Sequence, residues 1–317
     1  MGVTRRNFLG ASVAMATVGC VSERGAVPQS AAAQQLPRQF SLGQRTNLKL
    51  PYDGLVEPVR FFVIGDTHYG YHDGRDDAYA DNYRRMAGGK TKPGALASAL
   101  KRAREFKADI VLLVGDNISF PTYANIETLQ RELDESGVDW LYTAGNHDWH
   151  FEGMPGSDID QRRDWIGKRL GRFYRGENPL CHSKVVKGVR FVIIDNSVYH
   201  ILPEQLEFWK REAAKGDPIA LFMHIPLWVD GWGLFTCGCP TWGAETDPYW
   251  KIERREKWAV RQAEESFEFR EAVLSTPNLV GVFTGHEHRL MAAQVGRSLM
   301  FSVPSNRDGS AMSVELG

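Results

Sequence analysis

Five short turns in the sequence carry side chains that can bind a metal ion. Each turn follows an apolar run, contains glycine or proline, and holds aspartate, asparagine or histidine; the turns span residues 65–68, 115–117, 145–148, 224–226 and 285–288. Their potential ligands are carboxylate, amide and imidazole groups, with no thiolate: Asp66, His68, Asp116, Asn146, His224, His286 and His288. Such ligands suit manganese, iron or zinc and disfavour iron–sulfur chemistry.

The size of this ligand set favours two metal ions over one. A catalytic zinc ion usually takes about three protein ligands and keeps one position open, so a pair of ions that share a carboxylate fits better. Two ions about 3.5–4 Å apart can generate a hydroxide nucleophile at neutral pH and bind the oxygens of an in-line displacement at phosphorus. The predicted chemistry is therefore hydrolysis of a phosphoester.

The elements that must position these turns are strands alternating with helices. Apolar continuity and β-branched residues predict buried strands at 59–64, 109–114, 140–143, 190–194, 219–223 and 279–283. Helical patterns lie at 94–106, 125–136, 203–214 and 253–273. This alternation predicts an α/β fold with a largely parallel sheet, whose strand ends bring the turns to one crevice. Strand-like runs at 291–295, 298–303 and 311–316 predict a second, more antiparallel sheet.

The ordered series of motifs is much more specific than any one of them. The chain reads Asp-Thr-His, Gly-Asp, Gly-Asn-His-Asp, a later His, and Gly-His-Glu-His, and over residues 59–290 this series resembles the calcineurin-like metallophosphoesterase family. The resemblance implies a four-layer α/β/β/α sandwich, in which two mixed sheets are flanked by helices. It also implies a dinuclear centre that hydrolyses phosphoesters by attack of a hydroxide bridging the two metals.

Carried over onto this chain, the resemblance implies two sets of metal ligands joined by Asp116, which would bridge the ions. One set is Asp66, His68 and His288, and the other is Asn146, His224 and His286. His147 stands at the position of the family's non-ligand histidine, which stabilises the transition state or protonates the leaving oxygen. Asp148 would orient the ring of that histidine.

Subclass features narrow the substrate only in part. Purple acid phosphatases place a metal-binding tyrosine where this chain has Ser119. Protein serine/threonine phosphatases have different residues after the Gly-Asp of the second motif, so neither subclass is expected. The motif set is also similar to that of class III cyclic-nucleotide phosphodiesterases. We therefore expect a phosphodiester substrate first, with phosphomonoester or nucleotide hydrolysis as the alternative, because the metal ligands alone do not decide between them.

A tryptophan-rich insertion at 228–258 begins just after the fourth motif. It holds five of the nine tryptophans and the pair Cys237 and Cys239, whose disulfide state, alone or with Cys181, the sequence leaves open. One hypothesis is a cap in which Trp228 and Trp232 contact the organic portion of the substrate. The alternative is a self-packed insertion with a small core of its own.

The N-terminal residues resemble a twin-arginine export signal. Residues 4–9 read Thr-Arg-Arg-Asn-Phe-Leu and precede an uncharged, weakly apolar run that is too short to span a bilayer. We expect a signal peptide at 1–20, a linker at 21–55 and the metallophosphoesterase domain at 56–317, in a protein exported to the periplasm or the cell exterior. Residues 17–20 approximate a lipobox, which predicts a membrane tether through lipidated Cys20; cleavage near Ala33 is the alternative.

Composition limits the possible partners. The chain has 38 basic and 39 acidic residues, a net charge of −1, and no basic tail. We therefore do not expect a protein that binds duplex nucleic acid by non-specific charge. The expected partner is a small phosphoester substrate. A non-catalytic, envelope-binding lipoprotein built around the tryptophan-rich insertion is the rival function from another class.

Overall fold

The computed structural model describes residues 39–40, 46–86, 90–151, 153–229, 236–240 and 263–317. All of them belong to one compact unit, Leu36–Gly317. The expected signal peptide with Cys20, the competing site near Ala33, and Trp232 with most of the insertion lie outside the described residues. Within the described ranges, no helix is both long enough and apolar enough to cross a membrane.

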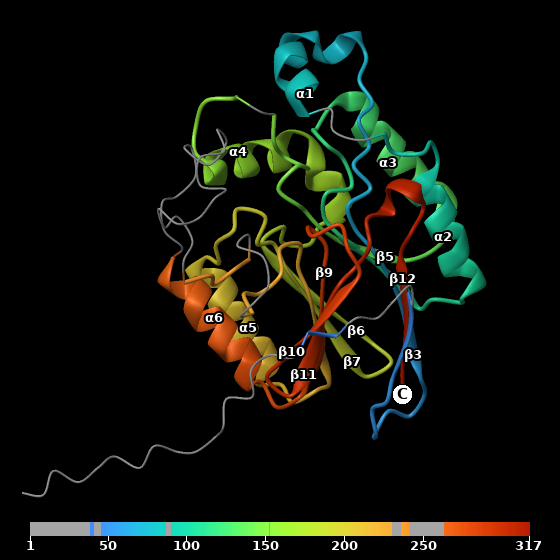
Figure 1. Ribbon diagram of the computed structural model, residues 1–317, viewed down its shortest axis with the longest axis vertical. Coiled ribbons are helices and arrows are strands. Elements are labelled where there is room, and N and C mark those ends of the chain that lie inside the picture. Colours follow the sequence, from blue (N-terminus) through green and yellow to red (C-terminus); the bar gives the residue numbers. More distant parts are fainter. Residues whose placement is uncertain (1–38, 41–45, 87–89, 152, 230–235, 241–262) are drawn as a thin grey trace, which may run out of the picture. The chain divides into compact units, whose positions relative to one another are not determined.

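Two mixed sheets form the centre of this unit (Figure 1). The seven-stranded sheet has the order β1 (Gln39–Phe40), β10 (Met291–Val295), β11 (Ser298–Ser302), β9 (Leu279–Thr284), β8 (Ile219–Phe222), β7 (Val189–Ile194) and β6 (Cys181–Val186). The five-stranded sheet has the order β2 (Asn47–Leu50), β12 (Met312–Leu316), β3 (Val59–Ile64), β4 (Ile110–Val114) and β5 (Trp140–Thr143). The strands that precede the five turns run parallel within each sheet: β3, β4 and β5 in one, β8 and β9 in the other.

Helices cover the outer faces of both sheets. Figure 1 shows α2 and α3 beside the five-stranded sheet and α5 and α6 beside the other. The helices are α1 (Ala80–Met86), α2 (Ala95–Glu105), α3 (Tyr123–Ser136), α4 (Asp158–Trp165), α5 (Pro203–Ala213) and α6 (Glu264–Ser275), with short 3₁₀ or π turns η1 (Gly74–Tyr79), η2 (Ile166–Leu170), η3 (Gly171–Tyr174) and η5 (Asn306–Asp308). Local signals set their ends: the Thr122 hydroxyl caps the start of α3, and Gly137 ends it at φ 67°.

The alternation of side chains along each strand explains the layering. In β3, Phe61 faces the core between the sheets, whereas its neighbour Phe62 faces the helices. Phe61 makes edge-to-face contacts with Phe191, Phe222 and Phe283 of the opposite sheet, at ring-centroid distances of 5.3, 5.8 and 5.1 Å. Because both faces of these central strands are buried, the sequence shows continuous apolar runs there.

The structure confirms the fold class and corrects two details. The runs after residue 290 do not form a separate antiparallel sheet: β10 and β11 extend the seven-stranded sheet, and β12 inserts between β2 and β3 of the other. The predicted linker also ends earlier than residue 55, because β2 pairs with β12 inside the domain. The predicted helix 253–273 appears as α6 in its described part.

Three strands, β1, β2 and β6, were not predicted from the sequence, and β6 is the longest of them. Strand β6 pairs antiparallel with β7 at the edge of its sheet. Its sequence is half polar, with His182, Ser183 and Lys184, and its residues Lys184 and Val185 are exposed. An edge strand with one solvated face lacks the apolar continuity by which the central strands were recognised.

Candidate dinuclear metal centre

The five turns converge, as the sequence predicts. Turns after β3, β4 and β5 come from one sheet, and turns after β8 and β9 come from the other. They bring together two groups of possible metal ligands, whose ligand atoms lie within 4.8 Å of one another in each group. The first group is Asp66, His68, Asp116 and His288, and the second is Asp116, His224 and His286.

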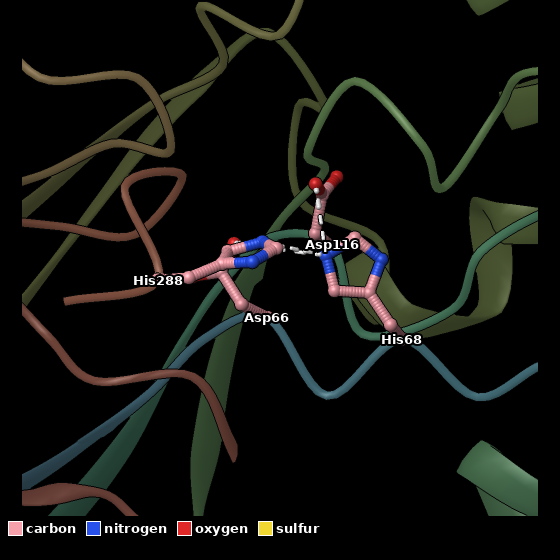
Figure 2. Close-up of side chains that lie close together, drawn as sticks. All are labelled: Asp66, His68, Asp116 and His288. Atoms are coloured by element: carbon pink, nitrogen blue, oxygen red, sulfur yellow. Dashed lines mark hydrogen bonds and ion pairs between the residues drawn. The ribbon is translucent and has the colours of Figure 1, made fainter. Parts of the chain in front are cut away.

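Figure 2 shows the first group, with its side chains pointing toward one another; Asp66 and His68 come from one segment, and Asp116 and His288 each come from another. The Nε2 atoms of His68 and His288 are 2.9 Å apart. His288 Nε2 lies 3.2 Å from Oδ1 of Asp66, and His68 Nε2 lies 3.5 Å from Oδ2 of Asp116. Two imidazole nitrogens facing each other beside two carboxylates is an arrangement that a shared cation stabilises.

The second group gathers around the amide of Asn146. Its Oδ1 lies 3.2 Å from Nε2 of His224 and 3.2 Å from Nδ1 of His286. His224 Nε2 is also 3.3 Å from Oδ2 of Asp116. The other ring nitrogen of His224, Nδ1, lies 2.8 Å from the carbonyl of Val114, so it donates there and leaves Nε2 for a metal.

Asp116 belongs to both groups through one atom. Its Oδ2 faces His68 on one side and His224 on the other. Its Oδ1 accepts a 2.8 Å hydrogen bond from the backbone amide of His147. The donor set would therefore suit two hard or borderline ions, with Asp116 as a residue common to both groups.

The backbone is strained at these turns. Asp66, His68, Asp116, His286 and His288 have φ values of 57°, 52°, 49°, 72° and 54°. Such left-handed conformations cost about 1–3 kcal/mol each for residues other than glycine, and they cluster at functional sites. The strain turns each side chain back toward the crevice immediately after its strand ends.

Two glycines make room for the carboxylates. A Cβ at Gly145 would lie 2.2 Å from Oδ1 of Asp116, and a Cβ at Gly285 would lie 2.5 Å from Oδ2 of Asp66. Both glycines precede ligand residues in their motifs. The glycine in each motif is thus explained by close approach of the backbone to a carboxylate.

Charges in the centre favour coordination. Burial raises the pKa of Asp116, but nearby His224 and His147 outweigh it and hold that pKa well below its usual value. Burial holds the pKa of the His68 ring well below its usual value. Burial also lowers the pKa of His224, yet the charge and hydrogen bond of Asp116 raise it to about 9. Asp116 and His68 are thus in their coordinating forms, whereas His224 must release a proton to bind a metal.

His147 and Asp148 lie beside the ligands. The ring of His147 is half-buried and lies edge-to-face with His68 at a centroid distance of 5.0 Å. The buried carboxylate of Asp148 accepts hydrogen bonds from the backbone amides of Ile118, at 3.0 Å, and Gly145, at 2.8 Å. Burial and the charge of Asp116 raise the pKa of Asp148 to about 7. These contacts hold two of the motif turns together, while orientation of the His147 ring by Asp148 stays a prediction.

Three further residues at the centre were not predicted from the sequence. Tyr199 places its hydroxyl 3.5 Å from Nε2 of His286, and Asn196 bonds the backbone of the residue after His224. Arg307, in η5, acts electrostatically on His68 and His288. The left-handed φ of 65° at Tyr199 cannot be recognised from the sequence, and Arg307 lies outside the five motifs.

The described residues include only some of those on which the substrate, disulfide and subclass predictions depend. Trp228 is half-buried and packs against Tyr199, Ile225 and Cys239. Cys181, Cys237 and Cys239 form no disulfide with one another. Ser119, at the position of the purple acid phosphatase tyrosine, donates to the carbonyl of His68 at 3.2 Å.

Comparison with known proteins agrees with this geometry. The family profile described as calcineurin-like phosphoesterase matches residues 59–290. A dimetal phosphatase from Danio rerio is similar in structure, with a TM-score of 0.51 at 12% identity, over 80% of this chain and 91% of that one. Purple acid phosphatase PPD1 from yellow lupin (Lupinus luteus) has a TM-score of 0.51 at 16% identity, over 83% of this chain and 46% of that one. No curated protein matches the chain.

These findings settle the family. The structural neighbours share the fold of two mixed sheets flanked by helices. The profile begins with β3 and ends just after His288, so it includes all five motif turns and both ligand groups. The chain therefore belongs to the calcineurin-like phosphoesterase family of metal-dependent phosphoester hydrolases.

Proposed function

We propose that this protein hydrolyses a phosphodiester at a centre of two metal ions. The observation that carries the proposal is the sharing of Asp116 by two ligand groups. Asp66, His68 and His288 would hold one ion, Asn146, His224 and His286 the other, and Asp116 both. The donor set suits manganese, iron or zinc. When bound, the ions supply Lewis-acid chemistry, activating water and neutralising charge on the phosphoryl oxygens.

His147 is the proposed proton donor to the leaving oxygen. Its half-buried ring adjoins His68 without belonging to either ligand group. A half-buried histidine beside the centre could transfer a proton to a substrate oxygen near neutral pH. Asp148 would act on His147 by fixing its turn, through the amides of Ile118 and Gly145.

Aromatic residues beside the centre, Trp228 and the buried Tyr199, support a diester over a monoester, and we call them the aromatic border. Tyr199 contacts His286 at the centre, and the half-buried Trp228 packs against the small cluster of Tyr199, Ile225 and Cys239. The half-buried ring of Trp228, supported from below by this cluster, would offer a surface to an organic group of the substrate beside the phosphoryl site. A diester has two such groups, so one can lie on this border while the other leaves. Trp232, outside the described residues, is proposed to contribute to the same border.

The experiment compares metal content and turnover of two aryl esters. Wild type should carry about two metal ions and hydrolyse bis-nitrophenyl phosphate faster than nitrophenyl phosphate. Asp116→Asn should lose most metal and nearly all turnover, whereas the control Asp134→Asn, on the exposed face of α3, should match wild type. Full activity in Asp116→Asn contradicts the mechanism, and faster monoester cleavage assigns a phosphomonoesterase or nucleotidase instead. A metal-loaded protein that cleaves neither ester points to the non-catalytic lipoprotein.

We further propose export through the twin-arginine pathway, with Cys20 as a lipid anchor. Arg5 and Arg6 beside Phe8 and Leu9 support the first part, and residues 17–20 support the second. Replacing both arginines by lysine should retain the protein in the cytoplasm. Mass spectrometry of the exported chain distinguishes a lipidated N-terminal Cys20 from cleavage near Ala33.

A further inference from the structure

We propose that Tyr199 is a positioning residue of the metal centre, which orients His286 so that Nδ1 faces the second metal position. The inference rests on the proposed metal centre and not on the identity of the substrate. Nothing in the motif series points to Tyr199, which lies in the loop between β7 and α5.

The contacts of His286 divide between its two ring nitrogens. Nδ1 faces the Asn146 amide oxygen at 3.2 Å, inside the second ligand group. Nε2 faces the Tyr199 hydroxyl at 3.5 Å, and the two rings meet edge-to-face with centroids 5.5 Å apart. A neutral histidine that binds a metal through Nδ1 carries its proton on Nε2, which can donate to the tyrosine oxygen.

The conformation of Tyr199 indicates that this contact is built into the fold. Its side chain is only 1% exposed, yet its φ is 65°, a left-handed value that is unusual for a bulky residue. The turn is held by a 2.8 Å hydrogen bond from its amide to the carbonyl of Asn196. Backbone strain of this kind persists where the surroundings impose it, often at functional sites.

The same loop also supports the second imidazole of that ligand group. The Asn196 side chain donates to the carbonyl of Ile225 at 2.7 Å and accepts from its amide at 3.0 Å. Ile225 directly follows His224. One loop therefore fixes the chain at His224 through Asn196 and the ring of His286 through Tyr199.

The test is Tyr199→Phe, which keeps the ring and removes only the hydroxyl. Metal-free protein is titrated with Mn²⁺ or Zn²⁺ by calorimetry. We expect one of two sites to weaken by about 10–100-fold, the usual effect of losing a partner of a metal-bound histidine, with the other site unchanged. The matched control is Tyr83→Phe, a buried tyrosine stacked on Phe120, which should bind both ions as wild type does.

Two further measurements separate positioning from a general structural effect. In wild type with metal bound, the Nε2 proton of His286 should appear as a protected resonance, and Tyr199→Phe should expose it to exchange. In a His286→Gln background, Tyr199→Phe should weaken metal binding no further. The proposal is overturned if Tyr199→Phe binds both ions like Tyr83→Phe, or if it causes the same loss with and without His286.

Arg307 carries a second inference, from an independent observation. We infer that its guanidinium binds an anionic oxygen of the phosphoryl group beside the first ligand group; this rests on the proposed phosphoester function. Arg307 lies outside the range matched by the family profile.

The loop that carries Arg307 is bonded directly to the first motif turn. Ser305 Oγ donates to the carbonyl of Asp66 at 2.7 Å, and the amide of Asn306 donates to the carbonyl of Gly65 at 3.0 Å. The Thr67 hydroxyl donates to Oδ1 of Asn306 at 2.9 Å. The backbone of Arg307 is thereby fixed close to Asp66.

The side chain of Arg307 has unused capacity for an anion. It is half-buried, and its Nε atom is buried with no hydrogen-bond partner among the described residues, which also offer it no carboxylate within ion-pair distance. Its positive charge is a minor influence on the pKa of His68, which burial lowers, and on the pKa of His288, which the hydrogen bond and charge of Asp66 raise against burial. An unpaired guanidinium donor beside a metal centre matches the fork geometry and charge of a phosphoryl oxygen pair.

Binding of inorganic phosphate to the metal-loaded protein tests this inference. Arg307→Met should weaken phosphate binding by about tenfold or more while metal content stays the same. The control Arg289→Met removes an exposed arginine near Glu287 and should leave phosphate binding unchanged. Equal phosphate affinity in wild type and Arg307→Met overturns the inference. Arg307-dependent phosphate binding without ester hydrolysis would sustain it and refute the proposed function instead.

Discussion

The backbone amide of His147 donates a 2.8 Å hydrogen bond to Oδ1 of Asp116, the carboxylate shared by both ligand groups. This bond engages one carboxylate oxygen, whereas the other, Oδ2, faces His68 and His224. It also fixes the distance between the proposed proton donor and the shared ligand. Because the main chain of His147 makes the bond, the donor of this bond stays in place when the side chain is substituted.

The first prediction separates these two roles of His147. His147→Ala keeps the amide that holds Asp116 and removes the proposed proton donor. Turnover should fall by about 10²–10⁴-fold, the usual contribution of general acid catalysis, with about two metals retained. Metal analysis and steady-state kinetics on bis-nitrophenyl phosphate check this. Loss of metal in this variant would show that the ring is a ligand and not an acid.

A second prediction concerns the close approach of Gly145 to Asp116. In Gly145→Ala the new Cβ meets Oδ1 of Asp116 at 2.2 Å, so the carboxylate or the turn must shift. Overpacking of this kind costs about 1–3 kcal/mol of folding stability. We expect lost metal binding together with a lowered Tm. The control Gly167→Ala adds a Cβ with no atom within 4 Å and should bind metal normally.

The metal ligands and the central strands are the parts of the site that the sequence could predict. Ligand residues such as Asp116 and His224 are recognisable because metal chemistry restricts their type and their place after apolar strands. The strands themselves were recognisable because both faces are buried, which makes them continuously apolar. Ligand positions and central strands therefore follow from local patterns.

Other features depend on contacts between distant segments. Tyr199 meets His286 across 87 residues of sequence, and its role arises from a left-handed φ that no local pattern reveals. Arg307 reaches the centre because Ser305 and Asn306 bond to the turn at Gly65, more than two hundred residues earlier. The placement of β12 in the five-stranded sheet is likewise a tertiary pairing, so local propensity assigned it to the wrong sheet.

A third prediction follows from the raised pKa of His224. In the metal-free protein that pKa is about 9, well above the value of about 6.5 for an unperturbed histidine. Metal binding must displace this proton, so apparent metal affinity should rise as pH rises toward 9, by up to about tenfold per pH unit for one proton. Calorimetry in buffers of different ionisation enthalpy measures the proton released.

The same group gives the metal-free protein the opposite pH dependence in stability. A histidine whose pKa is raised by folding contributes stability that is complete below about 6.5 and is lost as pH rises through about 9. Thermal unfolding in chelator should therefore show a Tm that falls across this window, while metal affinity increases. A Tm that stays level in chelator, or a metal affinity independent of pH, contradicts the assignment of a protonated His224.

The last prediction tests whether the aromatic border binds substrate. Trp228 is half-buried, lies under the guanidinium of Arg270 at 5.0 Å, and packs against the cluster that contains Tyr199, which in turn contacts His286. Trp228→Ala should raise KM for a diester with a large organic group more than for methyl nitrophenyl phosphate, because only the large group covers the ring. The value of kcat should change little, since Trp228 belongs to neither ligand group.

The matched control is Trp140→Ala. Trp140 is also half-buried and stacks with an arginine, Arg175, at 4.6 Å, but it lies at the start of β5, away from the strand ends that form the centre. This variant loses comparable packing, so a general loss of stability would lower activity on both esters in both variants. Selective loss of the large ester in Trp228→Ala alone places the organic group on the border. Equal KM effects on the two esters would mean that Trp228 serves only to pack the segment that follows His224.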